Sequence, residues 1–391
     1  MRIAIIGAGI GGLVTAVGLQ RDGHDVTVFE KRQEPNPGGA GLTLFGNSFS
    51  ALDLIGLGDI VRGISSDAIT SLRTGQRTPS GSWLLKVPSK YVSSMRTVHR
   101  VELHRVLQEQ LNSGTLRTGK TALVASDGKP EMVIDGHDED FDLIVAADGI
   151  NSQNRAQLGL DTGLHYSGFT AWRGVISKKV ELSGQAGETL GAGKIFGLVP
   201  LPHNRVYWYA TLNTPADTVF PDELQKLQQE FSDWHEPVSE CIAATEAEEI
   251  LHHDIYDLNK VLPSFVRGRT VLLGDAAHAM VPNLGQGAGQ AIEDAATLVY
   301  LLRYATEKNF DALLNEYTNI RQKRTKAIFD RSRMVSRFVQ VANPLAVEVR
   351  NASLRLTPGS IVGKMTQGIQ AWPNPEDIAR VQEEIWGSKL T

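Results

Sequence analysis

The sequence predicts a chain of the α/β class, in which a discontinuous α/β domain carries an inserted domain built mostly of antiparallel β-strands. Three observations lead to this prediction. The first thirty residues read as strand, helix and strand. Two later apolar runs end abruptly in acidic turns, and the long stretch between them alternates apolar and polar residues and is rich in aromatics. At 391 residues, the chain is long enough for two domains.

The N-terminal segment predicts a compact β-α-β unit. Residues 2–6 form a short run of branched apolar side chains that ends at a glycine, as a buried parallel strand does. Residues 11–22 have the apolar spacing of a helix, and Gly23 ends the pattern. Residues 25–30 alternate and predict a second strand, so one short crossover helix joins the two strands.

Two further buried strands are predicted where apolar runs meet an acidic turn, at residues 141–147 and 270–273. Between them, segments such as residues 205–212 alternate in the manner of an antiparallel sheet. Helices are expected at residues 222–234, 237–247, 289–306, 310–338 and 376–386. We assign residues 1–70, 96–165 and 264–335 to the α/β domain, residues 71–95 and 166–263 to the inserted domain, and residues 336–391 to a helical tail.

The composition excludes several functional classes. The net charge of −5 and the ordinary share of charged residues do not fit a disordered, fibrous or nucleic-acid-binding chain. Cys241 is the only cysteine, which rules out an intrachain disulfide and a thiolate metal site and favours a cytoplasmic protein. The sequence has no run of about 18 apolar residues and no signal-peptide pattern, so we expect neither a membrane span nor secretion. No metal site is predicted.

A glycine-rich turn follows the first predicted strand and opens the first helix. In this turn Gly7 allows a tight bend, Gly9 lets the backbone approach a pyrophosphate, and Gly12 lets the helix pack closely on the strand. The helix N-terminus directs its free N–H groups toward the phosphates. Glu30 ends the second strand, where its carboxylate can bind both hydroxyls of a ribose. A Rossmann-like dinucleotide-binding domain is therefore predicted, although this motif does not distinguish NAD from FAD.

A second glycine-rich motif indicates which dinucleotide is bound. Residues 271–278 lead to Pro282 and then to the glycine-rich residues 285–290. This pattern resembles the second FAD fingerprint of the flavin-dependent aromatic hydroxylases, the group A flavoprotein monooxygenases. The resemblance implies that Asp275 bonds the ribityl chain of FAD. It also places the N-terminus of the following helix near the flavin ring, where its dipole can stabilise negative charge on the reduced ring.

Smaller matches extend the resemblance over residues 1–335. Residues 146–155, with Asp148, resemble the family's Asp-Gly motif, which the family associates with FAD and NADPH binding. Gly41 and Thr43 match the segment beside the flavin in salicylate-hydroxylase-like members, and Arg100 matches an arginine that contacts FAD there; a surface residue at a helix start is the alternative for Arg100. The cofactor-binding residues implied by the motifs are Gly7, Gly9, Gly12, Glu30, Lys31, Gly41, Thr43, Arg100, Asp148, Asp275, Gly285 and Gly287.

The resemblance implies the aromatic hydroxylase fold and an FAD-dependent monooxygenase that uses NAD(P)H and O2 to hydroxylate an aromatic small molecule. In this family NADPH or NADH binds transiently and reduces FAD, and O2 then adds at flavin C4a to give the hydroperoxide that delivers oxygen. The expected catalytic residues are Pro282, beside the ring, and Tyr207, which matches a substrate-contacting tyrosine of urate-hydroxylating relatives. Packing within the sheet is the alternative for Tyr207. A monomer or homodimer is expected.

Departures from the family pattern bear on the substrate. Ile195 stands where the urate-hydroxylating relatives carry an arginine for an anionic substrate, and Lys194 stands where pyridine-hydroxylating relatives carry a histidine. These differences favour a less charged substrate, either a larger aromatic compound or a polycyclic one. Trp172 is expected either in the pocket wall or in the core, and we assign no histidine as a catalytic base.

Other function classes are weighed against this prediction. A flavoprotein halogenase needs a Trp-x-Trp-x-Ile-Pro segment, which this sequence does not contain. An FAD-dependent reductase of an unsaturated substrate and a non-catalytic flavin-binding regulator remain alternatives. The run of basic residues between Arg321 and Arg337 is expected to form a solvated helix face, with attraction of NADPH phosphates as a minor alternative.

Overall fold

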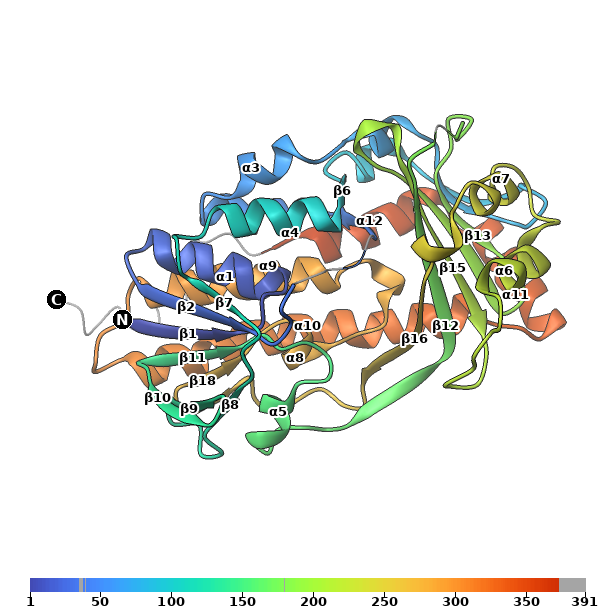
Figure 1. Ribbon diagram of the computed structural model, residues 1–391. Coiled ribbons are helices and arrows are strands. Elements are labelled where there is room, and N and C mark those ends of the chain that lie inside the picture. Colours follow the sequence, from blue (N-terminus) through green and yellow to red (C-terminus); the bar gives the residue numbers. More distant parts are fainter. Residues whose placement is uncertain (35–37, 39, 179, 373–391) are drawn as a thin grey trace.

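The apolar run at residues 2–6 forms a central strand of a parallel sheet. The computed structural model describes residues 1–34, 38, 40–178 and 180–372, and Figure 1 shows this sheet at the left. Four of the five residues of β1 (Arg2–Ile6) are buried, as expected for a strand covered on both faces. The strand order is β17-β18-β11-β1-β2-β7, and all neighbours pair in parallel except β17 with β18. The other strands are β2 (Asp25–Glu30), β7 (Leu116–Thr118), β11 (Leu143–Ala146), β17 (Val266–Arg267) and β18 (Thr270–Leu272).

Helices cover one face of the parallel sheet, and a small antiparallel sheet covers the other (Figure 1). Helix α1 (Ile10–Arg21) packs closely against α9 (Gly287–Leu302). Gly18 permits this approach, because a methyl group at this position would lie only 2.8 Å from a methyl carbon of Val299. Further helices of this part are α2 (Gly46–Leu54), α3 (Gly58–Gly63), α4 (Arg100–Glu109), α5 (Gln153–Gln157) and α8 (Asp275–His278). The small sheet contains β8 (Ala122–Val124), β9 (Glu131–Ile134) and β10 (His137–Asp140).

The predicted antiparallel region forms a seven-stranded sheet, which stands upright at the right of Figure 1. Its order is β16-β12-β15-β14-β13-β4-β5, and neighbours are antiparallel except β13 and β4. Helices α6 (Glu223–Phe231) and α7 (Val238–Ala243) cover its outer face over an apolar cluster that contains Trp208. The strands are β4 (Thr74–Arg77), β5 (Trp83–Val87), β12 (Leu164–Ile176), β13 (Gly187–Leu190), β14 (Lys194–Pro200), β15 (Val206–Asn213) and β16 (Leu251–Leu258). The domain limits remain predictions.

Helix α10 (Phe310–Val339) connects the two sheets (Figure 1). Near its start Tyr317 is buried in the core of the parallel sheet, and at its end Val339 packs in one cluster with Ile195 of the seven-stranded sheet. The remaining elements are a two-stranded sheet of β3 (Gly41–Leu44) and β6 (Arg96–His99), and helices α11 (Pro344–Leu356) and α12 (Gly359–Gln370). The helix predicted at residues 376–386 lies outside the described residues. Within the described ranges, every helix is too short or too polar to cross a membrane.

The prediction of a solvated basic face on α10 is wrong for Arg321. This arginine is fully buried, and its guanidinium contacts Glu293 and Asp294 of α9, each at 2.6 Å. Helix α9 is buried along nearly its whole length, so its two adjacent acids need cationic partners inside the protein. Arg324 also pairs with Glu293. One face of α10 therefore supplies the positive charges that neutralise the two acids of α9.

Candidate active site

The predicted glycine turn has the bend that dinucleotide binding requires. Gly7 has a φ of +105°, and a side chain at Gly12 would overlap the carbonyl oxygen of Gly7. Glu30, at the end of β2, accepts a hydrogen bond from the N–H of Ala8 at 2.9 Å, which ties the acid to the turn. No side-chain hydrogen bond caps α1, and a Cβ at Gly9 would meet no described atom within 4 Å. Free N–H groups and open space are thus available to a phosphate.

The second glycine motif presents an acid to the same edge of the sheet. Gly274 has a φ of +65°, and its N–H donates to Oδ2 of Asp294 at 2.9 Å, which holds the turn after β18. Asp275 is the first residue of α8 and is exposed, although the rest of this short helix is buried. Among the described residues, none forms a hydrogen bond with its carboxylate. Asp275 is therefore free to bind a ligand.

The Asp-Gly motif positions the second motif. Asp148 accepts hydrogen bonds from Oγ of Ser152 at 2.6 Å and from the side chain of Asn154 at 2.9 Å, which fixes the start of α5. Arg155 in α5 is buried and donates to the carbonyl of Ala276 in α8 at 3.2 Å. The carboxylate of Asp148 therefore stabilises the first turn of α5 through these hydrogen bonds. Cofactor binding by Asp148 stays a prediction.

Two arginines and a tyrosine converge between the two sheets. Burial lowers the pKa of the Arg100 guanidinium, and the nearby carboxylate of Asp275 opposes this shift. Arg173 on β12 also acts on Arg100, and its guanidinium lies close to the Tyr207 hydroxyl on β15. Burial raises the pKa of the Tyr207 hydroxyl, and both arginines oppose the shift. These four side chains therefore lie near one another, between α8 and the inner face of the seven-stranded sheet.

Several buried polar atoms around this region have no partner within the described part of the chain. They are Oδ1 of Asn47, Oγ of Ser48, Nδ1 of His99, Nε of Arg100, Oδ1 of Asn283 and Nε2 of Gln286. They come from α2, the β6–α4 junction and the turn before α9; α2 packs on α9, and β6 pairs with β3, which also contacts α9. Because buried polar groups are normally hydrogen-bonded, this set fits a ligand with polar atoms along its edge, as the flavin ring of FAD has.

The other predicted cofactor residues border the same region. Pro282 is exposed in the turn before α9, Gly285 has a φ of +62°, and a Cβ at Gly287 would meet no described atom within 4 Å. Gly41 and Thr43 lie on β3, and Lys31 is exposed next to Glu30. The three motifs follow β1, β11 and β18, which are neighbours in the sheet, so their carboxyl ends meet at one edge.

Comparisons with known proteins agree with this geometry. The family model described as an FAD binding domain matches residues 1–332. Aurachin C monooxygenase/isomerase from Stigmatella aurantiaca is 34% identical over 94% of this chain and 97% of that protein. The chain belongs to the FAD-dependent aromatic hydroxylase family. The hydroxylase is also 34% identical to 2-heptyl-3-hydroxy-4(1H)-quinolone synthase from Pseudomonas aeruginosa, over 92% of this chain and 95% of that protein.

A solved structure shares the fold of the hydroxylase. Klebsiella pneumoniae HpxO complexed with FAD and uric acid matches with a TM-score of 0.85 and 27% identity, covering 94% of this chain and 96% of that chain. The predicted aromatic hydroxylase fold, the FAD cofactor and a monooxygenase activity on an aromatic small molecule are thereby confirmed. The individual site residues remain predictions.

The inner face of the seven-stranded sheet meets the FAD-binding part of the hydroxylase at Tyr207. Its ring packs on the backbone of Gly41, where a methyl group would lie 2.5 Å from Cγ of the ring. Ile195 on the same face is buried in an apolar cluster with Val339 of α10. Trp172 instead lies in the core of the outer face, where it stacks on His252 with ring centroids 5.0 Å apart. Of the two predicted positions for Trp172, the core and not the pocket wall is therefore correct.

Sequence reasoning missed three residues of the inner face as site candidates. Arg173, Glu188 and Tyr209 share this face with Tyr207, because the antiparallel register places them in one row across four strands. The signal in the sequence that could have indicated this row is Gly197, a glycine inside a strand, which is typical of a close approach by a neighbouring group.

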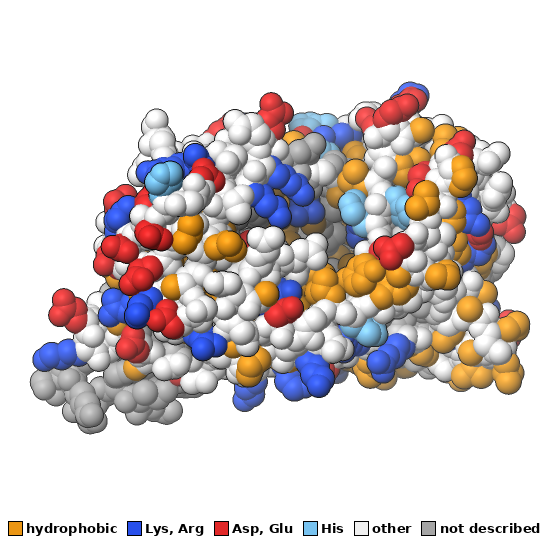
Figure 2. All heavy atoms as spheres, turned by 60° about the horizontal axis from the view of Figure 1, so that its bottom comes forward, with side chains coloured by type: hydrophobic (Ala, Val, Ile, Leu, Met, Phe, Trp, Pro, Cys, Tyr) orange, Lys and Arg blue, Asp and Glu red, His pale blue; other side chains and the backbone are white. Residues whose placement is uncertain are grey.

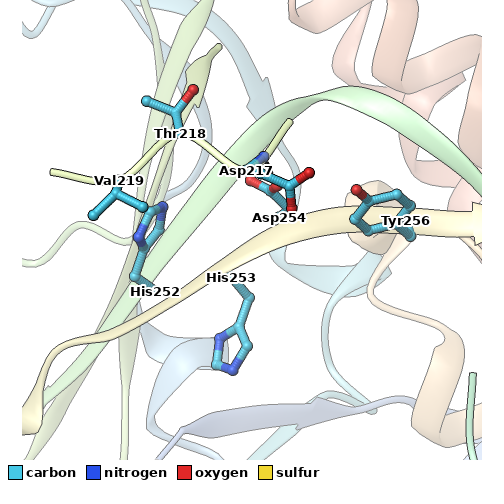
Figure 3. Close-up of a pocket in the computed structure, with 7 residues that line it drawn as sticks. All are labelled: Asp217, Thr218, Val219, His252, His253, Asp254 and Tyr256. Atoms are coloured by element: carbon cyan, nitrogen blue, oxygen red, sulfur yellow. Dashed lines mark hydrogen bonds between the residues drawn. The ribbon is translucent and has the colours of Figure 1, made fainter. Parts of the chain in front are cut away.

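A surface pocket of about 390 Å³ borders the site at the edge strand β16. It is lined by Asp217, Thr218, Val219, His252, His253, Asp254 and Tyr256. Figure 3 shows His253 on the opposite side of the strand from Asp254 and Tyr256. Burial and the charge of Arg173 lower the pKa of His253, which places its ring near the arginines. Figure 2 shows the surface hollowed between the two sheets, with basic side chains on one side and histidines on the other.

Proposed function

We propose that the hydroxylase acts on a weakly charged aromatic heterocycle with an apolar substituent, using NAD(P)H and O2. One observation supports a substrate of low charge. Ile195 is buried in an apolar cluster, at the position that resembles the urate-binding arginine of relatives. An anionic group placed against this cluster would lose its hydration without gaining a cationic partner there. The names of two relatives, which specify aurachin C and a heptyl-hydroxyquinolone, support the same substrate class.

The residues around the sheet edge can hold FAD. When bound, FAD supplies the redox chemistry, because it accepts hydride from NAD(P)H and activates O2. The turn that contains Gly7 and Gly12 would bind the pyrophosphate, and Glu30 the adenosine ribose. The carboxylate of Asp275 would accept hydrogen bonds from the ribityl hydroxyls. The N-terminus of α9, beginning at Gly287, would direct N–H groups to the flavin ring.

The inner sheet face can orient the substrate and exclude water. Tyr207 belongs to a buried apolar cluster with Ala40, Val175 and Leu201, which keeps water away from the reacting ring. The Tyr207 hydroxyl and Arg173 together offer hydrogen bonds to an oxygen substituent of the substrate. These contacts would hold the ring of the substrate in place against the flavin.

The remaining features of the proposal come from the sequence. NADPH or NADH would bind transiently, because the described residues form a single parallel sheet of the dinucleotide-binding kind. A cytoplasmic location and a monomeric or homodimeric state stay predictions.

The proposed function is tested by NAD(P)H oxidation under air with purified, FAD-loaded protein. The panel contains 4(1H)-quinolones with and without an alkyl chain, and urate and salicylate as anionic comparison compounds. We expect a quinolone to stimulate oxidation most, to release little hydrogen peroxide and to yield a product heavier by one oxygen atom. Stimulation by urate or salicylate alone would overturn the weakly charged substrate class, and oxidation that no compound stimulates would argue against hydroxylation.

Tyr207→Phe is expected to raise the KM for the substrate about 3- to 10-fold, because it removes one hydrogen-bonding hydroxyl from the site. The ring and its packing on Gly41 are kept. More NAD(P)H should then be oxidised per product formed, since a loosely held substrate is hydroxylated less efficiently. Tyr304→Phe is the matched control, because Tyr304 is 51% exposed. Unchanged kinetics in Tyr207→Phe would return this tyrosine to a packing role.

A further inference from the structure

A tyrosine and an acid lie together on the inner face of the seven-stranded sheet. Tyr209 stands two residues from Tyr207 on β15, so both rings point to the same face, with centroids 6.0 Å apart. Opposite Tyr209 on β14 is Gly197, where any side chain would overlap the tyrosine ring. The ring therefore extends across β14, and its hydroxyl donates to Oε1 of Glu188 on β13 at 2.8 Å.

Glu188 has unused capacity to accept hydrogen bonds. No cation acts on its carboxyl group within the described ranges, and Oε2 receives one long hydrogen bond, 3.4 Å, from Nε2 of Gln76. Burial raises the pKa of Glu188 and of its partner Tyr209. Both side chains nevertheless keep some accessible surface, so packing does not enclose them completely. A carboxylate has about four acceptor positions, and two are used here.

The pair faces the same region as the flavin-side residues. Tyr209 adjoins Tyr207, whose hydroxyl lies close to Arg173. Arg173 in turn lies near Arg100, and Arg100 lies near Asp275. An aromatic ring placed against Tyr207 would therefore meet hydrogen-bond donors on one side and a carboxyl acceptor on the other. This arrangement matches a ring with an oxygen acceptor at one position and an N–H donor across from it.

We propose that Glu188, held by Tyr209, is a specificity residue that accepts a hydrogen bond from a ring N–H of the substrate. The inference rests on the proposed function and narrows its substrate class to neutral N–H heteroaromatic compounds that carry a carbonyl or hydroxyl oxygen across the ring. A compound without a donor removes water from the unused acceptor position of Glu188 and offers no hydrogen bond in return, and an anionic substituent meets a group of like charge. Both N-alkylated analogues and aromatic carboxylates are thereby disfavoured.

Binding of 4(1H)-quinolone and of N-methyl-4-quinolone to the FAD-loaded protein tests this inference. Flavin fluorescence without NAD(P)H reports binding independently of turnover. We expect the unaltered protein to bind the N–H compound at least about 10-fold more tightly, because the N-methyl compound displaces water from the remaining acceptor position of Glu188 without offering it a donor. Glu188→Leu should reduce this ratio to about 2-fold or less. Glu248→Leu is the matched control, because Glu248 is exposed and should leave the ratio unchanged.

A second variant covers the case in which Glu188→Leu does not fold. Glu188→Gln keeps the size of the side chain but loses the charge, and the ratio should fall about 2- to 3-fold. Equal binding of the two quinolones by the unaltered protein, an unchanged ratio in both variants, or binding of neither compound overturns the inference. The proposed function is tested separately, by substrate-stimulated NAD(P)H oxidation with the whole panel. Failure of the Glu188 inference is therefore distinguishable from failure of the proposed function.

Discussion

Alanine in place of Asp275 is expected to give a hydroxylase that purifies largely without flavin. The carboxylate is exposed at the first residue of α8 and has no hydrogen bond to a described residue, so it is available to the ribityl hydroxyls. A hydrogen bond to a charged group contributes about 1.5–3 kcal/mol. Its loss corresponds to FAD binding weakened by about 10- to 150-fold. The substitution also removes the negative charge that opposes the desolvation of Arg100.

The measurement is the ratio of flavin to protein absorbance after purification, followed by the Kd for FAD of the flavin-free protein. Asp311→Ala is the matched control, because the Asp311 side chain is 82% exposed at the start of α10. Circular dichroism of both variants shows whether the fold is kept. If Asp275→Ala retains its full complement of FAD, the ribityl contact has been placed on the wrong residue.

The sequence was sufficient to predict the parts of the fold that depend on local patterns. The strand predicted at residues 2–6 coincides with β1, and the helix predicted at residues 310–338 differs from α10 by one residue at its end. Gly7 and Gly12 could also be predicted, because the bend after β1 needs a positive φ at one position and room for a carbonyl oxygen at the other. Periodicity and backbone sterics act over a few residues, so one sequence is enough to read them.

The parts that depend on long-range register could not be predicted in the same way. Glu188, Gly197 and Tyr209 meet only because β13, β14 and β15 pair in a particular register, which no local pattern specifies. The burial of Arg321 likewise depends on which face of α10 meets α9. The burial of Arg321 could have been inferred from a different part of the sequence. The otherwise apolar helix α9 contains two adjacent acids, and such buried acids require cationic partners.

Leucine in place of Arg321 is expected to lower the free energy of unfolding by about 3–5 kcal/mol, the usual cost of leaving a buried charge unpaired. Arg321 contacts Glu293 and Asp294, both fully buried. These acids also form hydrogen bonds with residues of the proposed FAD site. Glu293 accepts a hydrogen bond from Asn47 at 2.7 Å, and Asp294 accepts one from the N–H of Gly274 at 2.9 Å. Weaker FAD binding should therefore accompany the loss of stability.

The same network predicts how stability changes in acid. Burial disfavours the ionised form of Asp294, but His278 and Arg321 outweigh burial and lower its pKa to about 2 from the ordinary 3.8. Since the pKa is lower in the folded protein than in the unfolded chain, this carboxylate stabilises the fold fully above about pH 4. That contribution is lost as the pH falls from about 4 toward 2. Arg321→Leu removes one of the two cations responsible, so its stability should depend less on pH in this window.

Urea unfolding of the FAD-loaded protein, followed by tryptophan fluorescence at about pH 7 and about pH 3, measures both effects. Arg337→Leu is the matched control, because Arg337 is exposed on the same helix and its loss should change the unfolding free energy by no more than about 0.5 kcal/mol. Arg321→Leu should lose most stability at the higher pH, where both acids are ionised and each has lost one of its cationic partners. An equal loss at the two pH values would instead mean that packing of the arginine side chain, and not its charge, holds α9 and α10 together.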